Sequence, residues 1–274
     1  MYRIKLFYII LQEVFEIMAK SGLFDLTGRV AVITGASSGL GVQMAKAYAK
    51  QGADIAILAR RVEKLEKVAK EIRALGVKCL PVACDVTSTE AIKEAAAAVK
   101  KEYGKVDILV NNAGGGYTGP AVEMSDEDWQ WDLDVDLTGV FKMSREFAKI
   151  MMENKYGRII NISSMYGLVG NMAIPSSSYH AAKGGVINLT RALAAEWANE
   201  GITVNCICPG YFETELTVDT LSTDEFSAYM KSTVPLGRYG NEGELDSTAV
   251  YLASDSSAYV TGAIIPVDGG YTCV

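Results

Sequence analysis

The chain has 274 residues, 49% of them hydrophobic, and its 26 basic and 33 acidic side chains give a net charge of −7. This length suits one large α/β domain with a full core, and the acidic balance argues against a nucleic-acid partner. Five cysteines without paired C-x-x-C spacing and a single histidine argue against a disulfide framework and a metal site, and they indicate a reducing cytoplasm.

Residues 1–22 are predicted to form an amphipathic helical extension. The apolar run Leu6–Leu11 is too short to cross a bilayer and is followed by Gln12, Glu13 and Glu16, so neither an integral membrane segment nor a signal peptide is predicted. When residues 1–22 are placed on a helix, the polar side chains lie on one side and most of the other positions are apolar. We expect this helix to pack on its own subunit or a sister subunit. Membrane-surface attachment is the alternative, although the polar face is not strongly basic.

Residues 23–274 alternate between β-rich runs and helical patterns. The predicted strands are Val30–Thr34, Asp54–Ala59, Lys78–Ala83, Ile108–Asn111, Arg158–Ser163, Thr203–Cys208 and Ala263–Val267. The helical patterns between them include Leu40–Gln51, Val62–Leu75, Thr89–Tyr103 and Gly184–Asn199. This alternation predicts a single α/β domain with a doubly wound parallel sheet of about seven strands. The segment Tyr211–Arg238 breaks the alternation and is predicted to be an inserted helical flap.

The first strand runs into T-G-A-S-S-G-L-G at residues 34–41, which opens a helix. Such glycines let the backbone turn tightly and approach a phosphate at the helix N-terminus. The same letters contain G-x-S-x-G, a hydrolase nucleophile elbow with Ser37 as nucleophile and His180 as base. We reject the hydrolase because almost no sheet precedes the elbow, and because Ala59-Arg60-Arg61 stands where a dinucleotide fold selects its adenine ribose. Ser37 and Ser38 also suit helix N-cap positions.

Three further motifs carry chemistry: N-N-A-G at residues 111–114, Ser163-Ser164, and the run from Tyr179 to Lys183. On a helix, Tyr179 and Lys183 share a face. A tyrosine with the ordinary pKa near 10 is a poor acid–base catalyst, but an ammonium about 4 Å away favours the phenolate by up to about 4 kcal/mol. Ser164 can then orient a substrate oxygen for proton exchange with Tyr179.

Other reactive side chains are expected to be structural. His180 is predicted to be packed or hydrogen-bonded rather than catalytic. Cys206 and Cys208 alternate along a predicted strand and are expected to be inert residues in or near the core.

Together, T-G-x-x-x-G-x-G, N-N-A-G, the serine, Y-x-x-x-K and a late Pro209-Gly210 resemble the short-chain dehydrogenases/reductases, from about Leu26 to Gly270. The resemblance implies a Rossmann-type fold, hydride transfer between a nicotinamide cofactor and a small-molecule alcohol or ketone, and a homotetramer. It implies catalytic roles for Ser164, Tyr179 and Lys183. The cofactor residues that it implies are Gly35, Ser37, Ser38, Gly39, Leu40, Gly41, Asp85, Val86, Asn112, Ala113, Gly114, Tyr179, Lys183, Pro209, Gly210 and Thr214.

Two departures from the family pattern stand out. The stretch Val135–Gly139 resembles V-N-L-x-G, whose Asn completes the family's catalytic tetrad, but here the position holds Asp136. Because the family Asn acts partly through a main-chain carbonyl that holds a water, Asp136 is expected to serve. Ser164 and Tyr179 are also two residues further apart than in many members. The loop Asn171–Ser178 is therefore longer, where the resemblance implies that substrate enters.

The end of the second predicted strand bears on cofactor choice. Where an NAD enzyme carries an acid, this chain has Ala59, followed by Arg60 and Arg61. No carboxylate is there to repel a 2′-phosphate, and the arginines offer it charge-assisted hydrogen bonds. We expect NADP(H) to be preferred by about 10- to 100-fold, with NAD(H) as the alternative.

The substrate class is the least constrained prediction. The lining residues expected are Gly116, Tyr117, Met165, Tyr166, Asn171, Met172, Ile174, Tyr211, Phe212 and Leu216. Residues 209–215 and 268–272 look similar to gluconate 5-dehydrogenase and polyol-type members, which narrowly favours a polyol, keto-sugar or sugar acid. The aromatic and methionine content also suits a hydroxysteroid dehydrogenase. A third alternative is an inactive family member acting as a binding protein, which only Asp136 supports.

Overall fold

The structure is a computed structural model that describes residues 22–172, 174–214, 217, 221 and 223–274. The helix predicted within residues 1–22 lies outside these described residues, apart from Gly22, and so does the predicted substrate residue Leu216.

Seven strands within the described residues form one sheet, in the order β3-β2-β1-β4-β5-β6-β7, and every neighbouring pair is parallel. They are β1 Val30–Thr34, β2 Asp54–Ala59, β3 Cys79–Ala83, β4 Ile108–Asn111, β5 Gly157–Ile162, β6 Ile202–Pro209 and β7 Ile264–Val267. Each matches a predicted strand to within one residue at either end, which confirms the predicted sheet. The order changes direction between β1 and β4, the place where such sheets bind ligands at their carboxyl ends.

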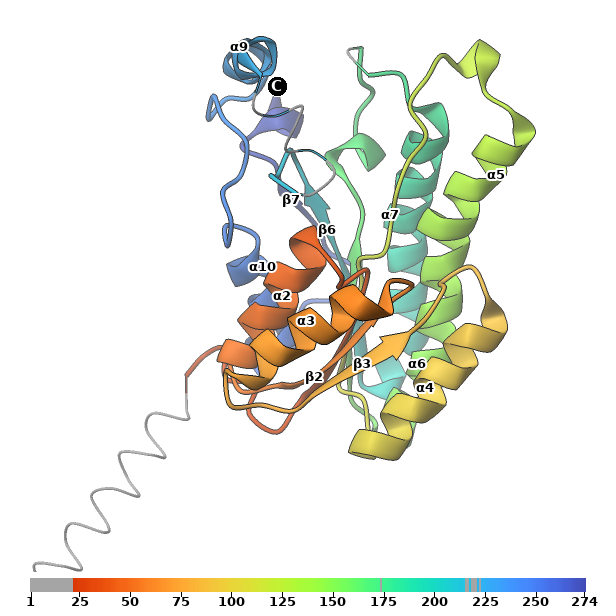
Figure 1. Cartoon of the computed structure of the whole chain (residues 1–274), viewed down its shortest axis with the longest axis vertical. Coiled ribbons are helices and arrows are strands. Elements are labelled where there is room, and N and C mark those ends of the chain that lie inside the picture. The colour runs from red at the N-terminus through yellow and green to blue at the C-terminus, as the bar shows by residue number, and fades with distance from the viewer. Residues whose placement is uncertain (1–21, 173, 215–216, 218–220, 222) are drawn as a thin grey trace, which may run out of the picture.

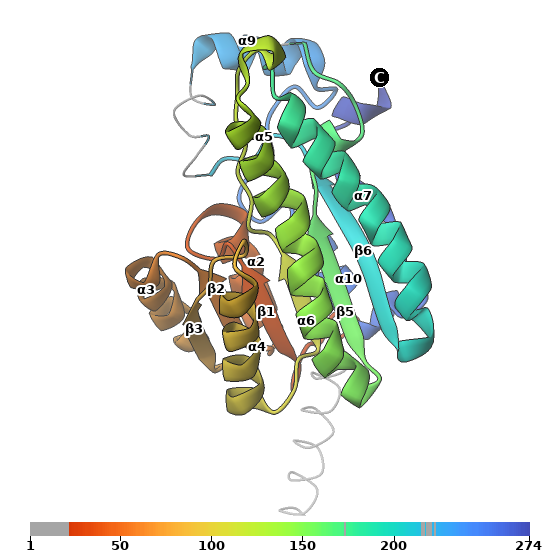
Figure 2. The same cartoon turned by 90° about the vertical axis from the view of Figure 1, so that its right-hand side faces the viewer.

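Helices cover both faces of the sheet (Figure 1, Figure 2). One face carries α2 Gly39–Lys50, α3 Val62–Arg73 and α10 Asp246–Ala253, and the other carries α4 Thr89–Tyr103, α6 Gly139–Asn154 and α7 Ser177–Trp197. Alternate strand residues enter separate cores: Ile33 packs in the cluster that contains Met44, whereas Val32 packs in the one that contains Phe147. Burial on both faces explains why the strand sequences are almost continuously apolar.

Two helical segments differ from the prediction. Between β4 and β5 lies α5 Asp126–Leu133, which runs through the π-helical turn η2 Asp134–Thr138 into α6, and no predicted helix covers this segment. Helix α7 begins at Ser177, seven residues before the predicted start at Gly184. The pair Gly184-Gly185 has low helix propensity, but packing of the helix on β6 outweighs it. Tyr179 and Lys183 therefore both lie on α7.

The remaining helices are short. Helix α9 Asp224–Thr233 lies in the segment predicted to be a helical flap. The single turns are η1 Ala121–Glu123, η3 Met165–Gly167, η4 Ala198–Glu200, η5 Asp255–Ser257 and η6 Tyr271–Cys273.

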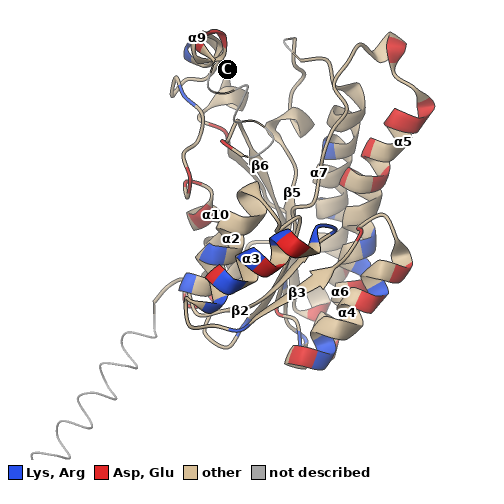
Figure 3. Ribbon diagram, viewed as in Figure 1, with Lys and Arg blue, Asp and Glu red and all other residues tan. Residues whose placement is uncertain are grey.

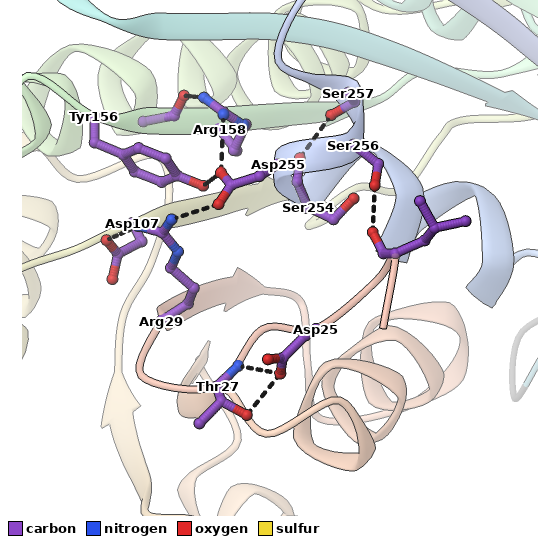
Figure 4. Close-up of polar contacts among 12 residues, drawn as sticks. Asp25, Thr27, Arg29, Asp107, Tyr156, Arg158, Ser254, Asp255, Ser256 and Ser257 are labelled. Carbon is purple, nitrogen blue, oxygen red and sulfur yellow. Dashed lines mark hydrogen bonds and ion pairs between the residues drawn. The ribbon is translucent and has the colours of Figure 1, made fainter. Parts of the chain in front are cut away.

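A charged network closes the amino-terminal edge of the sheet (Figure 4). The carboxylate of Asp255 binds Arg29 at 2.9 Å and Arg158 at 3.3 Å, and it accepts a hydrogen bond from the Tyr156 hydroxyl at 2.9 Å. Both guanidinium groups also lie over the Tyr156 ring, 3.8 and 4.4 Å from its centre. A cavity of about 500 Å³ beside this network is lined by Gly22, Leu23, Asp25, Thr27, Gly28, Arg29, Asp255 and Ser256. It lies at the edge of the sheet opposite the predicted cofactor motifs, and the network joins segments that are far apart in the sequence.

Candidate active site

The glycine turn between β1 and α2 packs directly on the segment that follows β4. Gly35 and Gly39 have φ angles of +65° and +58°, which other residues rarely adopt. A Cβ on Gly35 would lie 2.8 Å from Ala113 Cα, and one on Gly41 would lie 2.6 Å from Asn112 Nδ2. The two predicted motifs therefore form one edge at the N-terminus of α2, and the bare glycine backbone fits a dinucleotide phosphate.

Hydrogen bonds fix the N-N-A-G segment in this position. Thr34 Oγ1 accepts from the amides of Asn112 and Ala113, both at 2.9 Å, and Asn112 Nδ2 donates to the Thr34 carbonyl at 3.0 Å. The preceding Asn111 points into the core instead, where its Nδ2 donates to Ser144 and Asn161. The two asparagines thus have different tasks: Asn112 holds the glycine turn, and Asn111 ties β4 to its neighbours.

The end of β2 brings basic side chains to the same edge. Arg61 donates to Ser37 Oγ and to Ser38 Oγ, both at 2.9 Å. Ser38 occupies the N-cap position of α2, but its hydroxyl makes no capping hydrogen bond. The hydrogen bonds from Thr87 and the charge of Arg60 lower the pKa of Asp85, so this acid is ionised beside Arg60. Five of the predicted cofactor residues therefore gather at one corner.

The loop after β6 reaches the glycine turn from the other side. Strand β6 ends at Pro209, and the amide of Gly210 donates to the Val267 carbonyl at 2.9 Å. A Cβ on Gly39 would lie 3.2 Å from Thr214 Cβ. The predicted residues at both ends of the cofactor site are thereby brought together. Two more residues were predicted to contact the cofactor. Leu40 packs against the core from the first turn of α2, and Val86 follows Asp85.

Ser164, Tyr179 and Lys183 lie where β5 ends against α7. The buried Ser163 donates to the Lys183 carbonyl at 2.8 Å, which fastens the helix to the strand end. The Ser164 hydroxyl accepts from the Tyr166 amide at 3.1 Å. Lys183 is buried, with Nζ donating to the Ile162 carbonyl at 3.1 Å and lying 5.4 Å from the centre of the Tyr179 ring. A hydroxyl, a phenol and an ammonium therefore share one small region, as acid–base catalysis requires.

Asp136 contributes its carboxylate to this region. It has no exposed surface, and its Oδ1 lies 3.0 Å from Lys183 Nζ. The amide of Gly115 donates to both of its oxygens, at 3.3 and 3.4 Å. Burial raises the pKa of the Asp136 carboxyl, although the charge of Lys183 opposes this shift. Burial disfavours the charged form of Lys183 as well, but the nearby Asp136 and Tyr179 outweigh burial and raise the pKa of Lys183. A buried ion pair therefore accompanies the main-chain role expected for this position.

Aromatic side chains that carry hydroxyl groups gather beside Tyr179. We define the tyrosine cluster as Tyr166, Tyr211, Tyr229 and Tyr271. The hydroxyls of Tyr166 and Tyr211 are hydrogen-bonded, Asn171 Nδ2 donates to Tyr166 at 2.7 Å, and the Tyr229 and Tyr271 hydroxyls lie 3.4 Å apart. Burial raises the pKa of Tyr166 to about 12, so its hydroxyl keeps its proton at neutral pH.

Sequence reasoning missed Tyr229 and Tyr271, which come from α9 and the C-terminal turn. The C-terminal run Asp268–Thr272 had been singled out only for its family likeness. His180 stacks on Tyr166 at 4.8 Å between ring centres, and its Nδ1 lies 2.7 Å from the Ser176 carbonyl. This confirms that His180 is packed and hydrogen-bonded.

The other predicted substrate residues are spread more widely. A Cβ on Gly116 would lie 2.8 Å from Tyr179, and Ile174 accepts from Asn171 through its carbonyl. Met165 is buried and Met172 fully exposed, while Phe212 packs in the core on the α2 side of the sheet. Tyr117 is held by Asp132, a residue with no predicted role. Cys206 and Cys208 are buried behind Ser163, which confirms them as core residues.

Comparison with known proteins decides the family. The family profile described as "Enoyl-(Acyl carrier protein) reductase" matches residues 35–272. A crystal structure of a short-chain type dehydrogenase/reductase from Mycobacterium marinum superposes with a TM-score of 0.88 at 40% identity, covering 92% of this chain and 98% of the other. The chain belongs to the short-chain dehydrogenase/reductase family.

Two further relatives carry more specific names. The galactitol 2-dehydrogenase (L-tagatose-forming) of Cereibacter sphaeroides is 40% identical over 250 residues, which cover 91% of this chain and 97% of the relative. A gluconate 5-dehydrogenase from Burkholderia cenocepacia J2315, crystallised with NADP and tartrate, superposes with a TM-score of 0.87 at 36% identity, covering 92% of this chain and 98% of the other.

As a member of this short-chain family, the chain is an NAD(P)-dependent oxidoreductase of the alcohol dehydrogenase and ketone reductase type. No cluster of three or more metal-binding side chains occurs among the described residues. Within the same residues, none of the helices has the length and apolar character that spanning a membrane requires.

Proposed function

We propose that this protein interconverts a secondary alcohol and its ketone in a polyol, keto-sugar or sugar acid, with NADP(H) as the preferred cofactor. The observation that carries the substrate class is the set of hydroxyl and amide groups from Tyr166, Tyr211 and Asn171 beside Tyr179. A polyol or sugar acid offers hydroxyl groups that can exchange hydrogen bonds with these side chains, whereas an apolar steroid offers almost none. The names of the galactitol and gluconate relatives support the same class.

The catalytic roles follow from the chemistry of the three side chains. When bound, the nicotinamide cofactor supplies or accepts the hydride. Tyr179 exchanges the proton of the substrate oxygen, because its hydroxyl is the acidic group of the trio that can both give and take a proton. Lys183 favours the phenolate form through its nearby positive charge, and Ser164 orients the substrate oxygen. Asp136 acts on this exchange through Lys183 and the Gly115 amide.

Preference for NADP(H) rests on the corner formed by Arg61, Ser37 and Ser38. Arg61 already donates to both serine hydroxyls, so a phosphate placed there would meet a guanidinium and two hydroxyls together. Ala59 ends β2 without a carboxylate that would repel it. A gluconate 5-dehydrogenase relative crystallised with NADP supports this choice.

We also propose a homotetramer in the cytoplasm. The family likeness supports the assembly, and the five unpaired thiols support a reducing compartment. Light scattering of the purified full chain tests the tetramer. The inactive-member alternative is disfavoured because the hydroxyl, phenol and ammonium groups are all in place.

A substrate panel tests the function. Galactitol, mannitol and gluconate are compared with a hydroxysteroid and with a 3-oxoacyl thioester, each with NADP(H) and NAD(H), by following absorbance of the reduced cofactor. We expect kcat/KM for the best polyol or sugar acid to exceed that for either apolar substrate at least about tenfold. A higher value for the steroid or the thioester would overturn the substrate class.

A matched pair of variants links that result to the tyrosine cluster. Tyr166→Phe removes one hydroxyl from the cluster and should lower kcat/KM for the polyol about tenfold with little effect on an apolar ketone. Tyr103→Phe is the control, since its hydroxyl donates to the Ile55 carbonyl at 2.9 Å outside the site. It should leave both substrates unaffected.

A further inference from the structure

The helix between β4 and β5, which includes a π-helical turn, carries a buried acid that no motif singles out. Acidic residues, red in Figure 3, are spread along α5. Asp132 is the one buried residue of α5, with no exposed surface. Asp136 stands four residues later in the π-helical turn and therefore on nearly the same face. π-helical turns occur frequently at functional sites, which makes the partners of these two carboxylates worth comparing.

Each carboxylate binds one backbone amide of the loop after β4 and one side chain of α7. Asp136 accepts from the Gly115 amide and pairs with Lys183. Asp132 accepts from the Tyr117 amide, at 3.1 Å to each oxygen, and from the Ser178 hydroxyl. Ser178 directly precedes Tyr179, and Lys183 follows it by one helical turn. The two carboxylates therefore hold α7 on either side of the phenol.

The loop between them packs with no spare room. A Cβ on Gly114 would lie 2.5 Å from Asp136 Oδ1, one on Gly115 would lie 2.8 Å from the Trp131 ring, and one on Gly116 would lie 2.8 Å from the Tyr179 ring. Any shift of this loop is thus transmitted to Tyr179 by direct contact. The position of the loop in turn depends on the hydrogen bonds that its amides make to the two carboxylates.

We infer that Asp132 is a positioning residue of the reaction: through Ser178 and the Tyr117 amide it fixes the Gly114–Gly116 loop and the Tyr179 phenol relative to each other. The inference rests on the proposed acid–base role of Tyr179. Asp132 itself touches none of the reacting atoms. The Tyr117 amide faces both oxygens of Asp132, at 3.1 Å to each, so an asparagine side chain would set an NH2 donor against that amide in place of one acceptor oxygen.

The experiment compares Asp132→Asn, Ser178→Ala and the double variant. We expect each single variant to lower the plateau value of kcat at least about tenfold, with the cofactor Kd within about threefold of the parent. The double variant should fall less than the two single losses combined would predict, because both changes act on the Asp132–Ser178 pair. Ser178→Ala removes no charge. If it lowers kcat as much as Asp132→Asn does, the loss comes from the position of the side chains and not from a change in charge.

Hydrogen–deuterium exchange gives a readout that needs no substrate. Asp132→Asn should speed exchange in the peptide that covers residues 113–118, where the Tyr117 amide then faces an NH2 donor in place of one of its two acceptor oxygens. Thr190→Val is the matched control on the same helix. It removes a buried hydroxyl that bonds to the Val186 carbonyl and to Asn161, so it should lower the melting temperature with kcat and this exchange unchanged.

Three outcomes would overturn the inference: kcat of Asp132→Asn within about threefold of the parent, a loss confined to one limb of the pH profile, or a loss equalled by Thr190→Val. Exchange at residues 113–118 is measured on the protein alone. A parent enzyme that oxidises no polyol would therefore refute the proposed substrate class and leave the test of Asp132 intact.

Discussion

Asp136→Asn removes a negative charge beside the Lys183 ammonium and leaves the shape of the side chain nearly unchanged. The Asp136 carboxylate lies 3.0 Å from Lys183 Nζ, which is 5.4 Å from the centre of the Tyr179 ring. The carboxylate is therefore within about 8.4 Å of that ring centre. At an effective dielectric constant of about 20, a unit charge at that distance opposes the phenolate by about 2 kcal/mol, which corresponds to about 1.5 pH units.

The sign of the effect follows from repulsion. The phenolate is the form that takes the proton during alcohol oxidation, and the negative charge of Asp136 disfavours it. The Lys183 ammonium beside the carboxylate compensates part of its charge, so the full shift is not reached. The groups facing Asp136 are Lys183, Asp132 and the Gly115 amide, and Cys206 faces Lys183 from β6. We expect the pH of half-maximal oxidation to fall by about 1 unit, with the plateau kcat changed less than about tenfold.

The assay is the initial rate of polyol oxidation at saturating cofactor and substrate between about pH 5.5 and 10. Asp134→Asn is the matched control, because Asp134 lies in the same π-helical turn but its side chain accepts from Gln130 at the surface. It should leave the profile in place. A midpoint within about 0.2 units of the parent, or one that rises, would refute the electrostatic reasoning. A plateau about a hundredfold higher would show that the native carboxylate suppresses catalysis, in favour of an inactive member.

Four other changes test separate parts of the structure. Tyr179→Phe should leave the cofactor Kd within about threefold and lower kcat at least about a thousandfold; activity within tenfold of the parent would contradict its role. Ala59→Asp should shift kcat/KM toward NAD(H), because a carboxylate accepts from the ribose 2′-hydroxyl and repels a 2′-phosphate; a parent that already prefers NADH tenfold would contradict it. Asp255→Asn should lower the melting temperature by about 2–4 °C at pH 7, and because its folded pKa is lowered the difference should shrink as the pH falls below 3.8 and through the folded pKa, as differential scanning calorimetry can show. Deleting residues 1–20 should leave cofactor affinity intact but raise substrate KM or change oligomer size; if light scattering and kinetics are both unchanged, liposome sedimentation tests membrane attachment.

Local patterns were enough to predict the sheet and the cofactor edge. Each strand is a short apolar run, and the turns predicted to bind cofactor follow directly from strand ends, so Thr34–Gly41 and Asn111–Gly114 can be located from the sequence alone. Lys183 and Asp136 were both predicted as site residues, but the ion pair between them was not predictable from the sequence. It depends on the π-helical turn, which brings a carboxylate against α7 from 47 positions earlier in the chain.

The site residues that could not be predicted are those whose contacts are with residues far away along the chain. Tyr229 and Tyr271 are ordinary surface-type residues by pattern, and they meet only because α9 and the C-terminal turn converge over Tyr211. Asp132 looks like one more acid of a polar helix. Its burial is evident only in the structure, where this helix face lies against Tyr117 and Ser178.

The charges of the site explain why the loop after β4 is built from glycine. Of the two buried carboxylates only Asp136 pairs with the buried Lys183 ammonium, so backbone amides must supply hydrogen bonds to both. An amide can reach a buried carboxylate only if its own backbone approaches closely, and Gly114, Gly115 and Gly116 each lack the Cβ that would block that approach. The run of three glycines is thus the counterpart of the two acids. A single alanine in this loop should disturb Lys183 or Tyr179 as directly as a change in the acids themselves.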